Sequence, residues 1–240
     1  WKEGEVKNTY GTGLFLVANT KTTIVKDPRL VATVAWTRNG HTDYAVEGSV
    51  FTGGSLIQWL RDSLHFFKNA KDSEALARSV ESSDGVVLVP AFNGLGAPYW
   101  DSQARGLMIG LTRGTQPAHI TRAALEAIAY QTTDVVDTLR DTVHPRRLLA
   151  DGGATANGLL MQFQADMLDM PVLVATAGEM TGLGAAGMAG IGAGFWSDKQ
   201  FLDLPIAYKT YRPHTNSAER EARLTRWREA ISRCRNWSGL

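Results

Sequence analysis

Residues 147–157 read RLLADGGATAN, an apolar run that ends in a turn with two glycines. A helix is expected next, over residues 159–168, and residues 172–174 (VLV) form a second short apolar run. Short apolar runs that alternate with helices are typical of an α/β domain, in which helices cover the faces of a sheet. This part of the chain therefore predicts a strand, a turn, a helix and another strand.

The first fifty residues predict antiparallel strands. Four short apolar runs carry this prediction: residues 14–17, 22–25, 30–36 and 42–46. The first two flank a polar turn at residues 19–21, which suggests one hairpin. The last two flank Asn39-Gly40, a pair that supplies the positive φ angles of a second, tight hairpin. Three or four antiparallel strands are therefore expected at the start of the domain.

The rest of the chain adds helices and two more strands. Helices are predicted by residue spacing and composition at residues 56–67, 117–135, 183–193 and 217–235. Residues 86–89 and 107–109 are short apolar runs that predict strands. Together these elements predict one α/β domain over residues 1–240, with a mixed sheet and flanking helices.

The residues of two predicted helices, 183–193 and 217–235, indicate how these helices pack. The third is rich in glycine, at positions 182, 184, 187, 190, 192 and 194, which would let it approach the sheet or a neighbouring helix closely. The last is charged and amphipathic, and we expect Trp227, Ile231 and Cys234 to form its core-facing side.

The composition is that of an ordinary globular protein, with 44% hydrophobic and 20% charged residues among 240. Because 25 basic residues nearly balance 24 acidic ones, the charge gives no reason to expect a nucleic acid or a membrane partner. The apolar runs are too short for a membrane span, and the single cysteine cannot form an intramolecular disulfide. We therefore expect a cytoplasmic protein. Since the chain starts at Trp1 without an initiator methionine, we also expect it to be cut from a longer protein.

Three glycine-bearing turns are the candidate ligand site: residues 10–13, 51–55 and 151–157. Glycine lets a ligand approach the backbone, and backbone N–H groups at a turn or a helix start point toward anions. Thr12 adds a hydroxyl donor, and Asn157 adds an amide that can contact a purine or a ribose. Any one such turn is commonly only a turn, and none has Rossmann or P-loop spacing. From the residues alone, the conclusion stops at a candidate nucleotide site.

Other chemistry has less support. Asp151 follows an apolar strand, where a carboxylate can bind a metal or act as a base, although orienting the turn is its commoner role. The five histidines are scattered without the spacing of metal ligands, so no metal site is expected. No residue pattern here indicates a nucleophile.

Six segments of the sequence resemble the FGGY carbohydrate kinases, and within them the glycerol-phosphorylating branch. The segments are KNTYGTG (residues 7–13), EGSVFTGGSLIQWLRD (47–62), VPAFNGLGAPYW (89–100), GLMIGL with the following HI and AALE (106–126), DGGATAN (151–157) and MQFQAD (161–166). Together they span nearly the whole chain. The resemblance implies an actin-like ATPase, or RNase H-like, domain that closes on a partner domain around ATP.

The resemblance also implies roles for six residues. Thr12 would contact the phosphates, Gly54 and Gln58 would line the nucleotide from the next helix, and Gly153 and Asn157 would hold the adenosine side. Phe15 matches the aromatic residue that packs on the apolar face of glycerol. Strand alternation by itself leaves a core role open for Phe15. No residue here matches the family's catalytic aspartate, which is expected in an amino-terminal half outside this chain.

The activity implied is transfer of the γ-phosphoryl group of ATP to a terminal hydroxyl of glycerol, with Mg²⁺, by an intact enzyme that is a homo-oligomer. This half alone is expected to be inactive. Two alternatives stay open: an FGGY kinase for another polyol or sugar, and a stand-alone nucleotide-binding module. The chain departs from the usual family residues at Thr133, Gly182 and Gly187, where arginine, alanine and a larger residue are common. We expect these changes to loosen packing near the last helix and to leave the matched ligand contacts in place.

Overall fold

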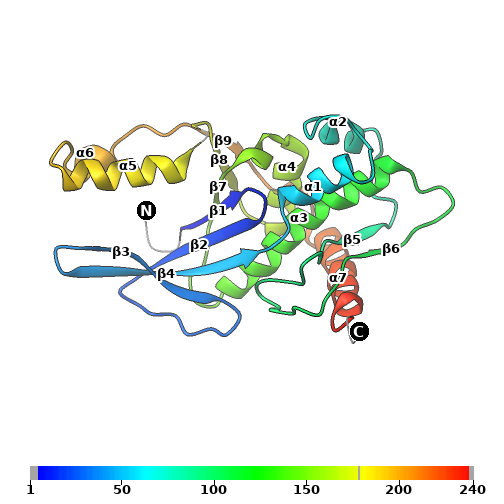
Figure 1. Cartoon of the computed structure of the whole chain (residues 1–240), viewed down its shortest axis with the longest axis horizontal. Coiled ribbons are helices and arrows are strands. Elements are labelled where there is room, and N and C mark those ends of the chain that lie inside the picture. Colours follow the sequence, from blue (N-terminus) through cyan, green and yellow to red (C-terminus); the bar gives the residue numbers. More distant parts are fainter. Residues whose placement is uncertain (1–4, 178, 238–240) are drawn as a thin grey trace.

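The computed structural model describes residues 5–177 and 179–237, so Trp1 lies outside the described residues. Within this part of the chain, a seven-stranded mixed sheet has the order β3-β4-β2-β1-β7-β8-β9 (Figure 1). Its strands are β1 (Val6–Tyr10), β2 (Leu14–Lys21), β3 (Val31–Arg38), β4 (His41–Val50), β7 (Leu148–Asp151), β8 (Val172–Ala175) and β9 (Tyr208–Tyr211). A separate two-stranded sheet pairs β5 (Val87–Val89) with β6 (Leu107–Ile109).

The helices of the described residues connect and cover these strands. They are α1 (Gly54–Asp62), α2 (Asp72–Arg78), α3 (Pro117–Leu139), α4 (Gly158–Leu168), α5 (Met180–Gly192), α6 (Asp198–Leu202) and α7 (Ser217–Cys234). A short 3₁₀ helix (Gly153–Ala156) lies between β7 and α4. The predicted mixed sheet with flanking helices is therefore present. None of the described helices has both the length and the apolar character needed to cross a membrane.

The first hairpin differs from the prediction. β1 pairs with β2 in antiparallel register around the turn at residues 11–13, and β2 continues through residues 19–21 instead of turning there. Asn19 is buried, and its Oδ1 accepts a hydrogen bond from the Lys21 N–H at a bulge in the β2–β4 pairing. The polar residues thus mark a bulge inside a strand, and the predicted strand at residues 22–25 does not form.

The second hairpin is confirmed. β3 and β4 meet at Asn39 and Gly40, whose φ angles are 51° and 75°. Both angles are positive, as a tight two-residue turn between twisted strands requires.

One face of the sheet is buried under α3 and α4. Strand alternation points Val6 and Tyr10 of β1, and Leu14 and Leu16 of β2, into this core. The hydroxyl of Tyr10 donates to Gln164 Oε1 of α4 at 2.8 Å, which satisfies a polar group that burial would otherwise leave unpaired. Desolvation by burial is the largest cause that raises the pKa of Tyr10 above its ordinary value.

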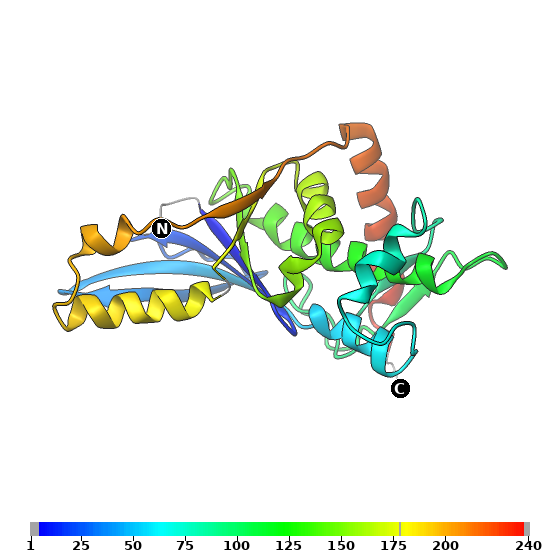
Figure 2. The ribbon, with the colours of Figure 1, turned by 90° about the horizontal axis from the view of Figure 1, so that it is seen from above.

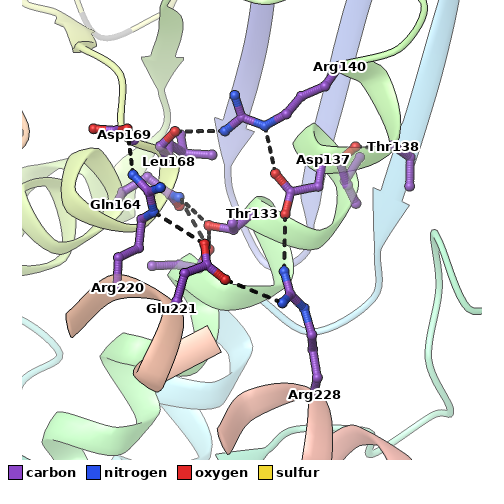
Figure 3. A network of polar contacts seen from close by, with 12 residues as sticks. Thr133, Asp137, Thr138, Arg140, Gln164, Leu168, Asp169, Arg220, Glu221 and Arg228 are labelled. Atoms are coloured by element: carbon purple, nitrogen blue, oxygen red, sulfur yellow. Dashed lines mark hydrogen bonds and ion pairs between the residues drawn. The ribbon is translucent and has the colours of Figure 1, made fainter. Parts of the chain in front are cut away.

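Helix α7 completes the core with the residues that the sequence predicts. Trp227, Ile231 and Cys234 are buried, and the Trp227 ring stacks on Tyr130 of α3 with centroids 5.2 Å apart. Figure 3 shows a network of polar contacts between α3, α4 and α7. In it, Asp137 of α3 pairs with Arg140 at 2.8 Å and with Arg228 of α7 at 3.7 Å. The network ties the carboxyl end of α3 to α7.

The family departure at Thr133 leaves no gap in this region. Thr133 is fully buried, its hydroxyl donates to the Ala129 carbonyl at 2.9 Å, and it lies 3.3 Å from Gln164 Nε2 (Figure 3). Thr133, at a position where arginine is common in the family, therefore forms hydrogen bonds both within α3 and with Gln164 of α4.

The prediction for the glycine-rich helix is only partly right. Figures 1 and 2 show α5 and α6 beside β3 and β4, at the end of the molecule away from α7. A Cβ on Gly187 would lie 2.0 Å from the Phe201 ring of α6, and one on Gly190 would lie 2.5 Å from Trp196. Cβ atoms on Gly184 and Gly192 would meet nothing within 4 Å. Close packing thus involves two of the glycines, and the partners are aromatic rings rather than the sheet. At Gly187 the Phe201 ring occupies the space of a larger side chain, so packing is not loosened there.

Candidate nucleotide site

A cavity of about 490 Å³ opens at the carboxyl ends of β1 and β7. All five residues assigned to the nucleotide line it: Thr12, Gly54, Gln58, Gly153 and Asn157. They come from three segments that lie up to 145 positions apart in the sequence. In sheets that contain parallel strands, ligands bind outside the carboxyl ends of those strands, and β1 and β7 are parallel neighbours.

A second cavity, of about 600 Å³, lies at the opposite end of these strands. Its lining includes Glu5 and Arg147, which directly precede β1 and β7, together with Asn19 and His144. It contains none of the glycine turns. Although this second cavity has the larger volume, it is not the candidate ligand site, because sheets with parallel strands bind ligands at the carboxyl ends of those strands and not at the amino ends.

The turn at residues 11–13 is fixed on the amino end of α1. The Gly54 N–H donates to the Gly11 carbonyl at 2.8 Å, and the Gly53 N–H donates to the Thr12 carbonyl at 2.8 Å. A Cβ on Gly54 would lie 2.8 Å from the Gly11 oxygen, so a larger residue would force the two segments apart. The Thr12 side chain is exposed and borders the cavity. The backbone bonds thereby hold a hydroxyl donor at the cavity rim.

The turn after β7 forms the opposite wall. Gly152 has a φ of 95°, and a Cβ there would lie 2.5 Å from the Tyr10 oxygen, so this position requires glycine. At Gly153, by contrast, a Cβ would meet nothing within 4 Å. The backbone of Gly153 is therefore open on its cavity side, where a ligand can approach it closely.

Asn157 is the N-cap of α4. Its Oδ1 accepts a hydrogen bond from the Leu160 N–H at 3.0 Å, which satisfies one of the free amides at the start of the helix. The Asn157 side chain is therefore held in place by its oxygen at the lining of the cavity, and its amide nitrogen can donate a hydrogen bond.

Asp151 forms an ion pair with Lys7. The Lys7 Nζ lies 2.9 Å from Asp151 Oδ1, and the carboxylate is buried. No group of three or more His, Cys, Asp or Glu side chains with metal-binding geometry occurs within the described residues. The expectation that Asp151 serves the structure of the turn is thus the one that its surroundings favour.

A short helix that the sequence did not predict contributes to the cavity lining. Lys71, which directly precedes α2, and Ser73 and Glu74 of α2 line the cavity together with Arg61 of α1. Glu74 Oε2 accepts from the Gly158 N–H at 3.0 Å, and Glu74 Oε1 accepts from the Leu159 N–H at 3.1 Å. These contacts join positions 84 and 85 apart in the sequence, so no local pattern could reveal them.

Phe15 lies outside the cavity, on the other side of the 11–13 turn. It is 51% exposed, whereas Leu14 and Leu16 on either side of it are buried. Its neighbours across the sheet are Thr9 of β1 and Ser49 of β4. This exposure contradicts a core role for Phe15 within the chain. The aromatic ring instead lies on the open face of the sheet, close to the turn that carries Thr12.

The chain resembles known proteins along its whole length. Residues 6–193 match the carboxy-terminal domain of the FGGY family of carbohydrate kinases. The glycerol kinase of Aromatoleum aromaticum is 53% identical over 98% of the chain, and that of Aquifex aeolicus is 52% identical over 98%. The chain spans 48% and 49% of these two proteins, so it corresponds to about half of their length.

A solved structure has the same fold. The crystal structure of Plasmodium falciparum glycerol kinase with ADP is 34% identical and has a TM-score of 0.88. The match covers 97% of this chain and 47% of that one. The predicted actin-like ATPase fold is thereby confirmed. With a family match over 188 of 240 residues (6 to 193), the chain belongs to the FGGY family of carbohydrate kinases.

Proposed function

We propose that this chain is the nucleotide-binding half of an ATP-dependent glycerol kinase. The observation that carries the proposal is the meeting of three separate glycine turns at one cavity. Their residues Thr12, Gly54, Gln58, Gly153 and Asn157 are those that the family resemblance assigns to ATP. Relatives named glycerol kinase are similar over almost the whole chain, which supports glycerol as the acceptor. The activity belongs to the full-length protein, of which this chain would be one domain.

The cavity suits a nucleotide chemically. Phosphoryl transfer depends on positioning and on stabilising negative charge more than on covalent chemistry by the protein. The Thr12 hydroxyl can donate to a phosphate oxygen, and the cation of Lys71 on the same lining favours an anion, whereas Arg61 is paired with Asp62 at 2.6 Å. At the other end, the Asn157 amide can donate to adenosine, while Gly153 leaves room for close approach.

Glycerol would lie next to the phosphate turn. Phe15 is three residues beyond Thr12 and exposes its ring on the open face of the sheet. In-line transfer requires the acceptor to be adjacent to the γ-phosphate, and a flat apolar wall there orients the carbon skeleton of glycerol. The hydroxyl groups would be held by the amino-terminal half, which also supplies the base. Among the described residues that line the cavity, Glu74 has the one carboxylate. It already accepts hydrogen bonds from α4 and Arg78, so we do not assign it as the base.

Mg²⁺ accompanies ATP in such a reaction, and the residues that the structure describes do not fit a magnesium site. Magnesium needs oxygen ligands in octahedral geometry. The described residues contain no cluster of carboxylates, and Asp151 is held by Lys7. We therefore assign the ion to the phosphates of ATP and to the part of the protein outside this chain.

The proposal is tested by substrate profiling of the full-length protein. ATP would be supplied with glycerol, with other polyols, with a sugar such as xylulose and with a sugar acid such as gluconate. ADP release would be measured for each acceptor. Glycerol should be the preferred acceptor, and glycerol 3-phosphate the product. If another polyol or sugar were the preferred acceptor, that compound and not glycerol would be the substrate. Nucleotide binding without turnover of any acceptor would identify a binding module instead.

We further propose that residues 1–240 form one domain that closes on the amino-terminal half. One cluster of buried hydrophobic residues includes side chains of β1, β2, β4, β7 and β8 together with α7. The full-length protein is proposed to be a homo-oligomer, which analytical ultracentrifugation would test directly.

A further inference from the structure

Glu74 joins two elements of the cavity wall that are distant in the sequence. It lies on α2, and both of its carboxylate oxygens accept backbone N–H groups at the start of α4, from Gly158 at 3.0 Å and from Leu159 at 3.1 Å. Arg78, one turn later on α2, donates to Glu74 Oε1 through Nε at 2.9 Å and through Nη2 at 2.8 Å. The carboxylate is thus fixed from both sides.

With these bonds, the first three amides of α4 have partners. Glu74 takes those of Gly158 and Leu159, and the Asn157 side chain takes that of Leu160. The start of a helix ordinarily attracts anions, because its free N–H groups and its dipole carry partial positive charge. Here a protein carboxylate already occupies this position, at the edge of the cavity.

The occupied helix start determines which end of a nucleotide can lie there. A phosphate beside α4 would find no free amide and would meet the negative charge of Glu74. The turn at residues 11–13 and the cation of Lys71 offer the opposite electrostatics on the same lining, where Arg61 is already paired with Asp62 at 2.6 Å. The uncharged adenosine therefore lies against α4, with the phosphates directed toward Thr12.

We propose that Glu74 is a positioning residue for the adenosine end of the nucleotide, acting through the start of α4 and through Asn157. The proposal rests on the proposed nucleotide site. Glu74 does not react, and its effect is to hold the backbone of Gly158 and Leu159 in the geometry that presents the Asn157 amide to the ligand. Losing it should weaken binding of the nucleoside part and leave glycerol unaffected.

The test uses the full-length protein that carries this chain, with two substitutions at Glu74. Glu74→Ala removes both acceptors, whereas Glu74→Gln keeps one carbonyl acceptor and the shape of the side chain. Glu229→Ala is the matched control, because Glu229 also pairs with an arginine four residues later, Arg233 at 2.8 Å, on α7 and outside the cavity lining. Affinities for adenosine, ADP and ATP would be measured by titration calorimetry, beside the Michaelis constant for glycerol and the Tm.

Glu74→Ala should weaken adenosine, ADP and ATP by the same factor, about 2- to 10-fold, the scale of one lost hydrogen bond. Glu74→Gln should lose less nucleotide affinity than Glu74→Ala, and Glu229→Ala should lose none. The glycerol constant should not change in any variant. These results are not expected of a carboxylate that only stabilises the fold.

Three outcomes would overturn the proposal. They are a loss confined to ADP and ATP, a change in the glycerol constant alone, and a lowered Tm with unchanged nucleotide affinity. If the unsubstituted protein bound neither ADP nor ATP, the nucleotide site itself would be wrong, and the role of Glu74 would fall with it.

Discussion

Asn157 has two hydrogen-bonding groups with different tasks. Its oxygen caps α4 through the Leu160 N–H, and its amide nitrogen is proposed to contact adenosine. Asn157→Ala removes both groups, whereas Asn157→Asp keeps an oxygen acceptor for the cap and loses the amide donor. The two substitutions therefore separate the structural task from the binding task.

We expect both substitutions to raise the Michaelis constant for ATP and to leave that for glycerol nearly unchanged. One neutral hydrogen bond is worth roughly 0.5–1.5 kcal/mol, or about 2- to 10-fold. Asn157→Ala alone should also lower the Tm, since loss of an N-cap costs about 1 kcal/mol. Steady-state kinetics and a thermal melt of the full-length protein check this. A change in the glycerol constant alone would contradict the adenosine assignment.

Phe15→Ala should weaken the use of glycerol and spare ATP. Packing a small carbon skeleton against an aromatic ring is worth roughly 1–3 kcal/mol, or about 10- to 200-fold. Since Phe15 is half exposed, its removal should cost far less stability than the 3–5 kcal/mol typical of a core phenylalanine. Phe195→Ala, at a phenylalanine exposed beside α5, is the control and should change neither constant. An unaltered glycerol constant in Phe15→Ala would remove Phe15 from the substrate site.

At the residue scale, the sequence predicts the site where the signal is local. Gly54, Gly153 and Asn157 stand in glycine turns next to helices, so backbone geometry by itself makes them candidates for a ligand site, and the structure places all three at one cavity. Glu74 could not be predicted in this way. Its partners are the backbone amides of Gly158 and Leu159, which no property of residues 72–78 indicates.

At the element scale, helices α3 and α7 share a buried carboxyl group. Asp134 of α3 accepts hydrogen bonds from the Trp227 Nε1 of α7 at 2.6 Å and from the Tyr99 hydroxyl at 2.8 Å. Desolvation by burial raises the pKa of Asp134 to about 7, and the negative charge of Asp137 adds to this, while the two hydrogen bonds and Arg228 oppose it. The folded state therefore binds a proton that the unfolded state releases near pH 4.

This difference gives stability a definite dependence on pH. Between about pH 4 and pH 7 only the unfolded state loses the proton of Asp134, so this group lowers the free energy of unfolding as the pH rises. Asp134→Asn keeps an oxygen acceptor for Trp227 and Tyr99 and removes the charge. We expect the Tm of the variant, relative to that of the unsubstituted protein, to be higher at pH 8 than at pH 5. Melting curves that run parallel at all pH values would show that Asp134 keeps its ordinary pKa.

The elements themselves divide into two groups by the kind of signal that they carry. Helix α3, the β3–β4 hairpin and the β7–α4–β8 series follow patterns visible in the sequence, and the structure confirms them. β1, α2, α6 and β9 were missed because each is short, and the two strands also depend on pairing with other strands. β9, for example, is defined by antiparallel pairing with β8. The predicted strand at residues 22–25 failed for the related reason that Asn19 is buried in a bulge rather than exposed in a turn.

At the scale of the whole molecule, the two proposed ligands lie on two sides of one turn. The nucleotide cavity is at the carboxyl ends of β1 and β7, and Phe15 lies beyond the turn on the open face of the sheet. The chain spans about half the length of its curated relatives. A partner domain over the open face would bring the hydroxyl groups of glycerol, the base and the γ-phosphate together at the turn that carries Thr12.

We therefore expect the 240 residues alone to bind a nucleotide and not to phosphorylate glycerol. The one carboxylate among the described residues that line the cavity, Glu74, accepts bonds from α4 and Arg78, so it is not free to accept the proton of a substrate hydroxyl. The purified chain would be incubated with ATP, Mg²⁺ and glycerol, and glycerol 3-phosphate would be assayed beside the full-length protein. Binding of ADP, measured by titration calorimetry, would establish that the chain is folded in the same experiment. Turnover by the chain at the rate of the full-length protein would mean that the base lies within these residues, and Asp151 and Glu74 would then be the first carboxylates to substitute.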